Sequence, residues 1–158
     1  MSLLARTLVA VRRRLLSFST VPRIGVRLLA ATPDDRVLLV KHTYQPGWHL
    51  PGGGVKTGER AEEGAMREGW EESGCRVAAV DGLLGLYANF SVGWSDHVAV
   101  YVSRGIPTDA VLPDQPPARL EIEAAALFPV DDLPADICPS SLRRIEEWRG
   151  VRPIDRDW

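Results

Sequence analysis

Three glutamates in one short stretch of the chain carry the clearest chemical signal. Glu68, Glu71 and Glu72 follow a run of three glycines at residues 52–54 and a polar segment. On a helix, residues three and four positions apart lie on one face, so the three carboxylates project from a single stripe. Like charges at that spacing destabilise an isolated helix, and a hard cation such as Mg²⁺ is the simplest partner that relieves the repulsion.

The glycine run adds the second part of such a site. Because Gly52, Gly53 and Gly54 carry no Cβ, their backbone can approach a metal ion or a phosphate closely. Most glutamate clusters are solvated helix faces, and the stripe alone would be interpreted in that way. The glycine loop at a fixed distance before the stripe favours a metal site instead.

These residues resemble the Nudix box, the signature of hydrolases that act on nucleoside diphosphates linked to another moiety. The lead-in at residues 48–52 and the closing segment at 128–134 are also similar to the family, so the resemblance covers about residues 22–150. The positions that match the box are Gly53, Glu59, Arg67, Glu68, Glu71, Glu72, Gly74 and Cys75.

The resemblance implies metal-dependent hydrolysis of a diphosphate bond in a nucleoside diphosphate derivative, a small-molecule substrate. The implied cofactor is Mg²⁺, with Mn²⁺ as an alternative, held by Glu68, Glu71, Glu72 and the backbone of Gly53. Arg67 is expected to hold one of the glutamates by a charge-assisted hydrogen bond. The alternative function is a catalytically weak or inactive Nudix-fold module that binds nucleotides.

Two further roles depend on the same resemblance. Family members use either a glutamate of the box or one from a distant loop as general base, here Glu72 or Glu121, with Glu123 as a less favoured choice. Exposed aromatic rings stack readily on nucleobases, so Tyr44, Phe90 and Trp94 are the predicted substrate-binding residues. The identity of the nucleotide derivative does not follow from the sequence.

One position departs from the family pattern. Gly69 stands where the family has an apolar residue, often Leu, that packs the box helix onto the sheet. A glycine inside a helix costs about 1 kcal/mol relative to alanine, and Gly64 adds a second one. Trp70 is the neighbouring candidate to supply the missing packing.

The chain on either side predicts a single domain at residues 21–158. Apolar runs at residues 24–31, 36–42, 77–80, 83–90, 96–102 and 122–130 are strand-like, and residues 107–119 hold four prolines and predict a loop. Ser140 or Ser141 is expected to cap a last helix that ends near Trp148. Interleaved strands and helices without βαβ repeats favour an α/β (α+β) fold, a Nudix-like α/β/α sandwich with a mixed sheet between helices.

Residues 1–20 form a distinct basic segment. Residues 4, 8, 11, 15 and 18 are apolar at helical spacing, and the segment contains four arginines and no acidic residue. The favoured interpretation is an amphipathic helix that packs on the domain or in a homodimer. Attachment to an anionic membrane surface and a targeting peptide are the alternatives.

Composition narrows the class of protein. The 158 residues suffice for one domain with its own core. The formal net charge of -2 argues neither for nor against a polyanionic partner, and with a small-molecule substrate implied by the resemblance no DNA partner is expected. The two cysteines, Cys75 and Cys138, are too few for a disulfide framework, which favours a reducing, cytoplasmic location. Neither has zinc-ligand spacing to a second Cys or a His, so no structural zinc site is expected. No apolar run is long enough to span a bilayer.

Overall fold

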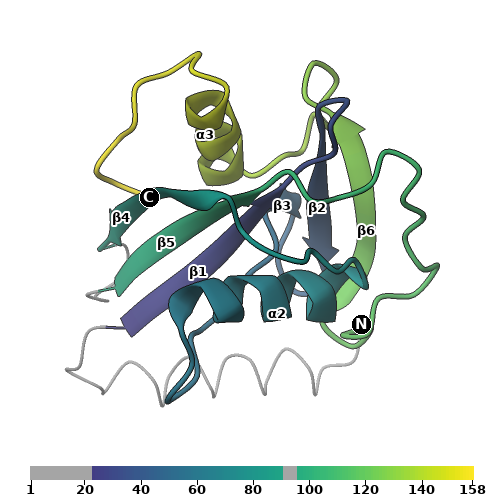
Figure 1. Cartoon of the computed structure of the whole chain (residues 1–158), viewed down its shortest axis with the longest axis horizontal. Coiled ribbons are helices and arrows are strands. Elements are labelled where there is room, and N and C mark those ends of the chain that lie inside the picture. The colour runs from purple at the N-terminus through teal and green to yellow at the C-terminus, as the bar shows by residue number, and fades with distance from the viewer. Residues whose placement is uncertain (1–22, 91–95) are drawn as a thin grey trace.

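The computed structural model describes residues 23–90 and 96–158 (Figure 1). The basic segment at residues 1–20 and Trp94 lie outside the described residues, so the expectations for them stay predictions. Within the described residues the elements follow in the order β1 Arg23–Ala30, β2 Arg36–His42, β3 Trp48–His49, α2 Ala61–Ser73, β4 Gly82–Asn89, β5 Asp96–Ser103, β6 Ile122–Pro129 and α3 Pro139–Trp148.

The strands form two three-stranded sheets. In the first, β1 pairs in parallel with β5, and β4 runs antiparallel to β5 at the edge. In the second, β2 lies between β3 and β6 and is antiparallel to both. The mixed sheet predicted from the sequence is therefore confirmed, and the structure adds a second, antiparallel sheet beside it.

Apolar residues on both faces of the central strands produce two cores. Leu28 of β1 belongs to a hydrophobic cluster with Ala65 of α2, whereas Leu29, the next residue, clusters with Ile145 of α3. Successive side chains of a strand point to opposite faces, so the two helices cover opposite sides of the strands (Figure 1). This arrangement confirms the predicted α/β/α sandwich.

The glycine loop is hydrogen-bonded along the free edge of β1. The N–H of Val26 donates to the carbonyl of Gly53 at 2.9 Å, and the N–H of Leu28 donates to the carbonyl of Pro51 at 2.9 Å. Because α2 packs on the same strand, the loop and the helix that follows it are fixed relative to each other.

Two local expectations were wrong. Residues 77–80 form no strand, although Ser103 Oγ of β5 donates to the Ala79 carbonyl at 2.7 Å. Helix α3 begins after Cys138, with Pro139 as its first residue, and neither predicted serine caps it. Ser141 instead accepts a hydrogen bond from the N–H of Leu50 at 3.0 Å and ties α3 to the segment before the glycine loop.

The loop predicted from the prolines is confirmed. Residues 107–119 contain no helix or strand, as the prolines predicted. Cys75 is buried and Cys138 is partly exposed, and neither is in a disulfide. In the part of the chain that the structure describes, no helix is long and apolar enough to cross a membrane.

Candidate active site

Helix α2, which carries the glutamates, is continuous and well terminated. The N–H of Arg60 donates to the Glu63 carboxylate at 3.2 Å in a capping box. At the other end, Gly74 has a left-handed φ of 74° and its N–H donates to the carbonyl of Trp70 at 2.7 Å. The interior glycines therefore do not interrupt the helix.

Leu28 compensates for the missing side chain at Gly69. A Cβ on Gly69 would lie 2.5 Å from Leu28 Cδ2, so the leucine already fills the space that an apolar helix residue would take. Trp70 does not fill it, because its ring lies under the Arg76 guanidinium at 4.1 Å. The packing between α2 and β1 is thus supplied from the strand.

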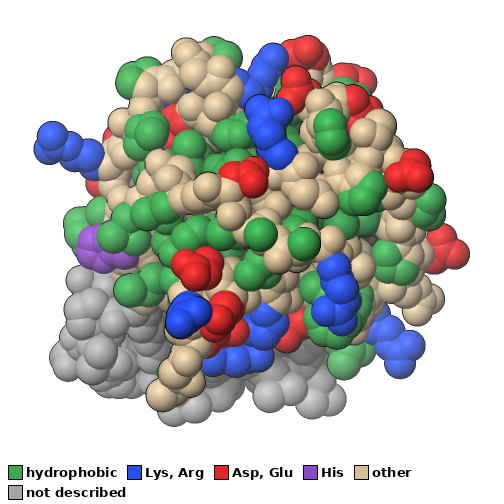
Figure 2. Space-filling model, in the orientation of Figure 1, with side chains coloured by type: hydrophobic (Ala, Val, Ile, Leu, Met, Phe, Trp, Pro, Cys, Tyr) green, Lys and Arg blue, Asp and Glu red, His purple; other side chains and the backbone are tan. Residues whose placement is uncertain are grey.

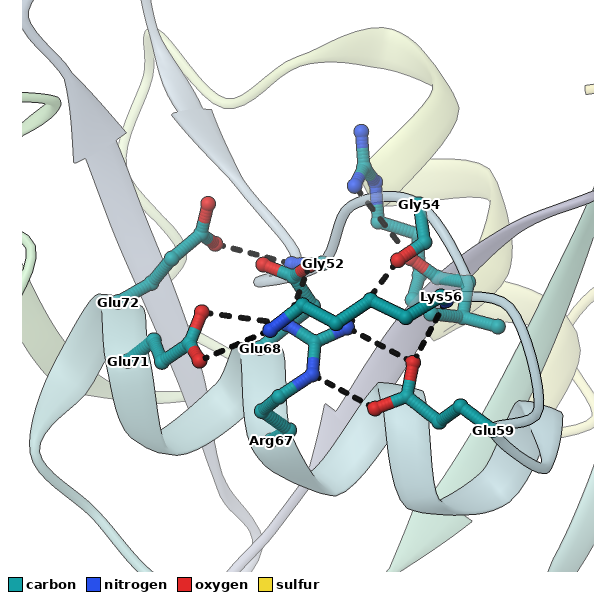
Figure 3. A network of polar contacts seen from close by, with 10 residues as sticks. Gly52, Gly54, Lys56, Glu59, Arg67, Glu68, Glu71 and Glu72 are labelled. Atoms are coloured by element: carbon teal, nitrogen blue, oxygen red, sulfur yellow. Dashed lines mark hydrogen bonds and ion pairs between the residues drawn. The ribbon is translucent and has the colours of Figure 1, made fainter.

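Arg67 connects the carboxylates of the site (Figure 3). It donates to both oxygens of Glu59, at 2.7 and 3.0 Å. Its Nη1 donates to Glu68 at 2.8 Å and to Glu71 at 3.1 Å, and its Nη2 donates to the carbonyl of Gly54 at 3.1 Å. The hydrogen bonds from Arg67 lower the pKa of Glu59 to about 2, so this carboxylate stays charged.

Glu72 lies apart from Arg67 and is the most buried of the stripe. Only 7% of the residue is exposed, and its Oε2 accepts a hydrogen bond from the N–H of Gly52 at 2.9 Å (Figure 3). Burial raises the pKa of Glu72 to about 7, although the bond from Gly52 and the charge of Arg27 oppose the rise. A nearby cation would stabilise the charged form of this carboxylate.

The glycine loop lies in direct contact with the stripe. A Cβ on Gly53 would lie 2.6 Å from Glu68 Oε1, so any other residue would displace the carboxylate or the loop. At Gly52, φ is 154° and a Cβ would lie 2.1 Å from the carbonyl oxygen of Val26. These contacts explain why two successive glycines precede the helix.

The described residues do not form a preassembled metal cage. Within residues 23–90 and 96–158, no group of three or more His, Cys, Asp or Glu side chains lies close enough to hold a metal ion. The guanidinium of Arg67 forms ion pairs with Glu68 and Glu71 and so neutralises part of the charge of the stripe. The donor set still fits a hard divalent cation, because it consists of carboxylate oxygens, and Glu72 has no side-chain cation bonded to it among the described residues.

Two charged residues outside the helix act on Glu72. Glu121, just before β6, is exposed, and its charge raises the pKa of Glu72. The charge of Arg27 on β1 opposes the raised pKa of Glu72, and it adds to the larger effect of burial in lowering the pKa of His42. Arg27 was not predicted from the sequence, although an arginine among the apolar residues of a strand is a signal that could have identified it.

The predicted substrate-binding aromatics lie at the ends of different sheets. Tyr44 follows β2, is 40% exposed, and its ring centroid lies 5.0 Å from that of His42. Phe90 follows β4 at the edge of the other sheet and contacts His97, with ring centroids 5.8 Å apart. The structure therefore does not bring Tyr44 and Phe90 together, and their role stays a prediction.

A surface pocket of about 360 Å³ flanks Glu121. Leu120 and Ile122, the residues on either side of Glu121, both line it, together with Thr43, Asp114, Gln115, Pro116, Arg119 and Glu123. The loop that forms one wall is attached to α2, because the N–H of Ala118 donates to the carbonyl of Glu71 at 2.8 Å. The pocket thus lies beside the carboxylates rather than on a separate part of the molecule.

Comparison with curated proteins shows partial similarity to a MutT-like protein and to an mRNA hydrolase. Over 70 residues the chain is 39% identical to a MutT-like protein of Streptomyces ambofaciens, a match that covers 44% of this chain and 45% of that protein. Over 125 residues it is 32% identical to the m7GpppN-mRNA hydrolase dcap-2 of Caenorhabditis elegans, covering 75% of this chain and 15% of that protein. The chain therefore matches less than half the length of these curated relatives.

A solved structure and a family model extend the match over most of the chain. The crystal structure of a MutT NUDIX hydrolase from Burkholderia pseudomallei is similar with a TM-score of 0.66 and 26% identity, covering 80% of this chain and 98% of that one. A family model described as a NUDIX domain matches residues 21–148. The resemblance inferred from the box is confirmed, and the chain belongs to the Nudix family.

Proposed function

We propose that this chain is a metal-dependent pyrophosphohydrolase that cleaves the diphosphate bond of a nucleoside diphosphate derivative. The observation that carries the proposal is the contact between the glutamate stripe and the glycine loop, with Glu72 buried against the N–H of Gly52. A buried carboxylate of this kind is costly in a merely structural helix, whereas it suits a site that binds a cation.

The residues that would hold the ion are Glu68, Glu71, Glu72 and the backbone of Gly53. The family uses divalent metal ions, and the oxygen donors here favour Mg²⁺, with Mn²⁺ as an alternative. When bound, such an ion neutralises phosphate oxygens and lowers the pKa of a coordinated water molecule.

The protein's own groups would orient these parts. Arg67 holds Glu68 and Glu71 through charge-assisted hydrogen bonds and so limits the directions in which they point. Arg27 lies close enough for its charge to lower the pKa of Glu72, and a positive charge beside the stripe suits a phosphate oxygen of the substrate.

The proton acceptor for the attacking water would be Glu121 or Glu72. Glu121 is exposed and therefore accessible to water, and it lies close enough for its charge to affect Glu72. Glu72 is the alternative, although the bound cation that the reaction requires would stabilise its charged form and so weaken it as a base. Glu123 lines the flanking pocket, and this position suits contact with the substrate better than the role of proton acceptor.

For the nucleoside part, the exposed ring of Tyr44 and the pocket beside Glu121 are the favoured contacts. The nematode relative is named for hydrolysis of m7GpppN-mRNA, so capped RNA belongs among the compounds to test. The substrate class proposed here is limited to a nucleoside carrying a phosphate anhydride.

A substrate screen with matched variants tests the proposal. Nucleoside di- and triphosphates, sugar nucleotides, dinucleotides and capped RNA are incubated with Mg²⁺ or Mn²⁺ at mildly alkaline pH, and phosphate-containing products are measured. Glu71→Gln and Glu72→Gln are each expected to lower the rate about 100-fold or more, because charge stabilisation in the transition state is lost. Glu62→Gln, on the same helix but outside the stripe, should retain the rate.

Two outcomes would contradict the proposal. Full activity in both variants of the stripe would show that the metal assignment is wrong. Tight nucleotide binding by the wild-type protein without any product would instead favour a binding or regulatory module.

A further inference from the structure

Exposed apolar side chains gather beside the edge strand β4. Ile24, Leu83, Leu86 and Phe90 are exposed by 52%, 53%, 53% and 61%, and they account for four of the nine large hydrophobic residues that are exposed in the described part of the chain. We refer to these four residues as the β4 face. Single exposed hydrophobic residues are common, whereas a group on one surface indicates a partner.

The strand register places this group on the side of the sheet that α2 covers. Leu86 lies opposite Ala99, which lies opposite Val26, and both of these residues are buried in the cluster that includes Ala65 of α2. Leu83 lies opposite Tyr101, which packs against the same cluster. Leu83 and Leu86 therefore extend the apolar surface under α2 outward to the edge of the sheet.

Helix α2 does not reach this edge. It packs on β1 and also contacts β5 and β6, and Figure 1 shows β4 farther out, beyond β5. In the same orientation, Figure 2 shows hydrophobic side chains exposed on the left, where β4 and β5 lie. The sheet thus offers space for a second helix beside α2 on its outer strands.

The sequence before β1 matches this surface in hydrophobicity and charge. The predicted helix at residues 3–18 has an apolar side formed by residues 4, 8, 11, 15 and 18. Residues 1–20 contribute +4 to a whole-chain charge of -2, which leaves -6 on the rest. Two acidic residues adjoin the β4 face, Glu62 and Asp96. Asp96 is the first residue of β5. Glu62 lies near Tyr101, because its charge adds to the larger effect of burial in raising the pKa of Tyr101.

The length of the segment also fits. A helix of residues 3–18 is about 24 Å long, close to the roughly 27 Å of an eight-residue strand such as β4. β1 begins at Arg23, next to Ile24 of the β4 face, and β4 lies two strand spacings, about 10 Å, away. Four linking residues span up to about 14 Å. The covalent connection gives the segment an effective concentration in the millimolar range at this surface.

We propose that residues 3–18 form a helix that packs, through its apolar side, on the β4 face of the same chain. This helix lies beside α2 and covers the outer strands of the mixed sheet. Its arginines face Glu62, Asp96 and solvent. The contact is intramolecular, and it is independent of the substrate on which the enzyme acts.

Limited digestion of the full chain with trypsin tests the contact, because residues 12–14 are all arginine. Leu86→Glu and Leu83→Glu place a charge in the β4 face, and Val11→Glu places one in the segment. Each is expected to speed cleavage at residues 12–14 about tenfold, because destabilising the docked state by about 1.4 kcal/mol raises the undocked population tenfold. Combining Leu86→Glu with Val11→Glu should add little, since either change alone already releases the segment.

Val111→Glu is the matched control. Val111 is 92% exposed in the proline-rich loop, so this substitution should not alter cleavage.

Light scattering and sedimentation with phosphatidylserine-containing vesicles are measured on the same samples. Equal cleavage rates in the wild type, Leu86→Glu and Leu83→Glu would overturn the proposal. A dimer that Leu86→Glu dissociates would assign the β4 face to a second copy instead. Vesicle binding of the wild type with unprotected arginines would assign the segment to a membrane surface.

Discussion

Two arginines contact glutamates on opposite sides of the strands, and they differ in exposure and in charge balance. Arg67 of α2 contacts three carboxylates and keeps 18% of its side chain exposed. Arg144 of α3 is fully buried and pairs with Glu147, also buried, at 2.6 Å. The first cluster has an excess of negative charge next to water, whereas the second is balanced and dry. Only the first is therefore suited to accept a further cation.

The surroundings of Arg144 explain why its cluster is closed. Its guanidinium lies 3.8 Å from the ring centroid of Tyr87, whose hydroxyl donates to Glu147 at 2.8 Å. It also donates to the carbonyl of Asp157 at 3.0 Å, and Trp158 contacts Tyr87 edge-on. The C-terminal tail thus covers the pair, and this cluster links the tail, α3 and β4 rather than binding a ligand.

The largest expected effect comes from breaking the buried pair. Arg144→Met should lower the free energy of unfolding by about 3–5 kcal/mol, because it leaves the carboxylate of Glu147 buried without a cation. Urea denaturation measures the change. Arg143→Met, at the neighbouring and less buried position, should change stability by no more than about 0.5 kcal/mol.

A second substitution distinguishes loss of charge compensation from loss of packing. Arg144→Met combined with Glu147→Leu should be more stable than Arg144→Met alone, since no buried charge then remains. If the double variant is instead the less stable of the two, packing rather than electrostatics accounts for the cost.

An intermediate effect is expected when a divalent cation is added. At a hundredfold excess of Mn²⁺ over its dissociation constant, binding to the folded state alone raises the free energy of unfolding by about 2.7 kcal/mol. Thermal unfolding with Mn²⁺ and with a chelator measures this gain. The Arg144→Met variant should show the same gain, because Arg144 lies on the other side of the sheets from the stripe.

The gain should disappear when Glu68→Gln and Glu71→Gln are combined. Glu62→Gln, which removes a glutamate from the same helix outside the stripe, is the control and should retain it. Equal stabilisation of all these variants by Mn²⁺ would mean that the ion binds elsewhere. The statement that the Arg67 cluster is the one suited to accept a cation would then be wrong.

The sequence predicted the first cluster and not the second, for a physical reason. Glutamates on one helical stripe and the glycines before them lie close together in the chain, so their spacing determines their arrangement. Arg143 and Arg144 look equivalent in the sequence, and only the tail around Trp158 and the distant Tyr87 decide which one is buried. For Arg27, the sequence shows a charged residue within an apolar strand, but its effect on Glu72 depends on how β1 lies against α2.

The same limit applied to Gly69. The sequence shows the absence of a side chain but not the leucine that replaces it, which lies 41 positions earlier on β1. Five of the six strands were placed to within a residue or two. The two-residue β3 was missed and residues 77–80 were wrongly predicted as a strand, because short apolar runs do not show whether a partner strand is available.

The smallest expected effect tests the packing between α2 and β1. Gly69→Ala gains about 1 kcal/mol in helix propensity, but its Cβ would lie 2.5 Å from Leu28 Cδ2, and overpacking of a core costs about 1–3 kcal/mol. Since Leu28 is fully buried, we expect a net loss of about 1 kcal/mol in the free energy of unfolding. Urea denaturation of Gly69→Ala, Leu28→Val and the double variant measures it.

The double variant should be more stable than the sum of the single changes predicts, by about 0.5 kcal/mol or more, because the smaller valine admits the new methyl group. Gly82→Ala is the control, since no atom lies within 4 Å of its added Cβ. Strict additivity would mean that Leu28 does not fill the space at Gly69. The helix would then be held to the sheet by other contacts, and the position of Glu68 and Glu72 against the glycine loop would not depend on this leucine.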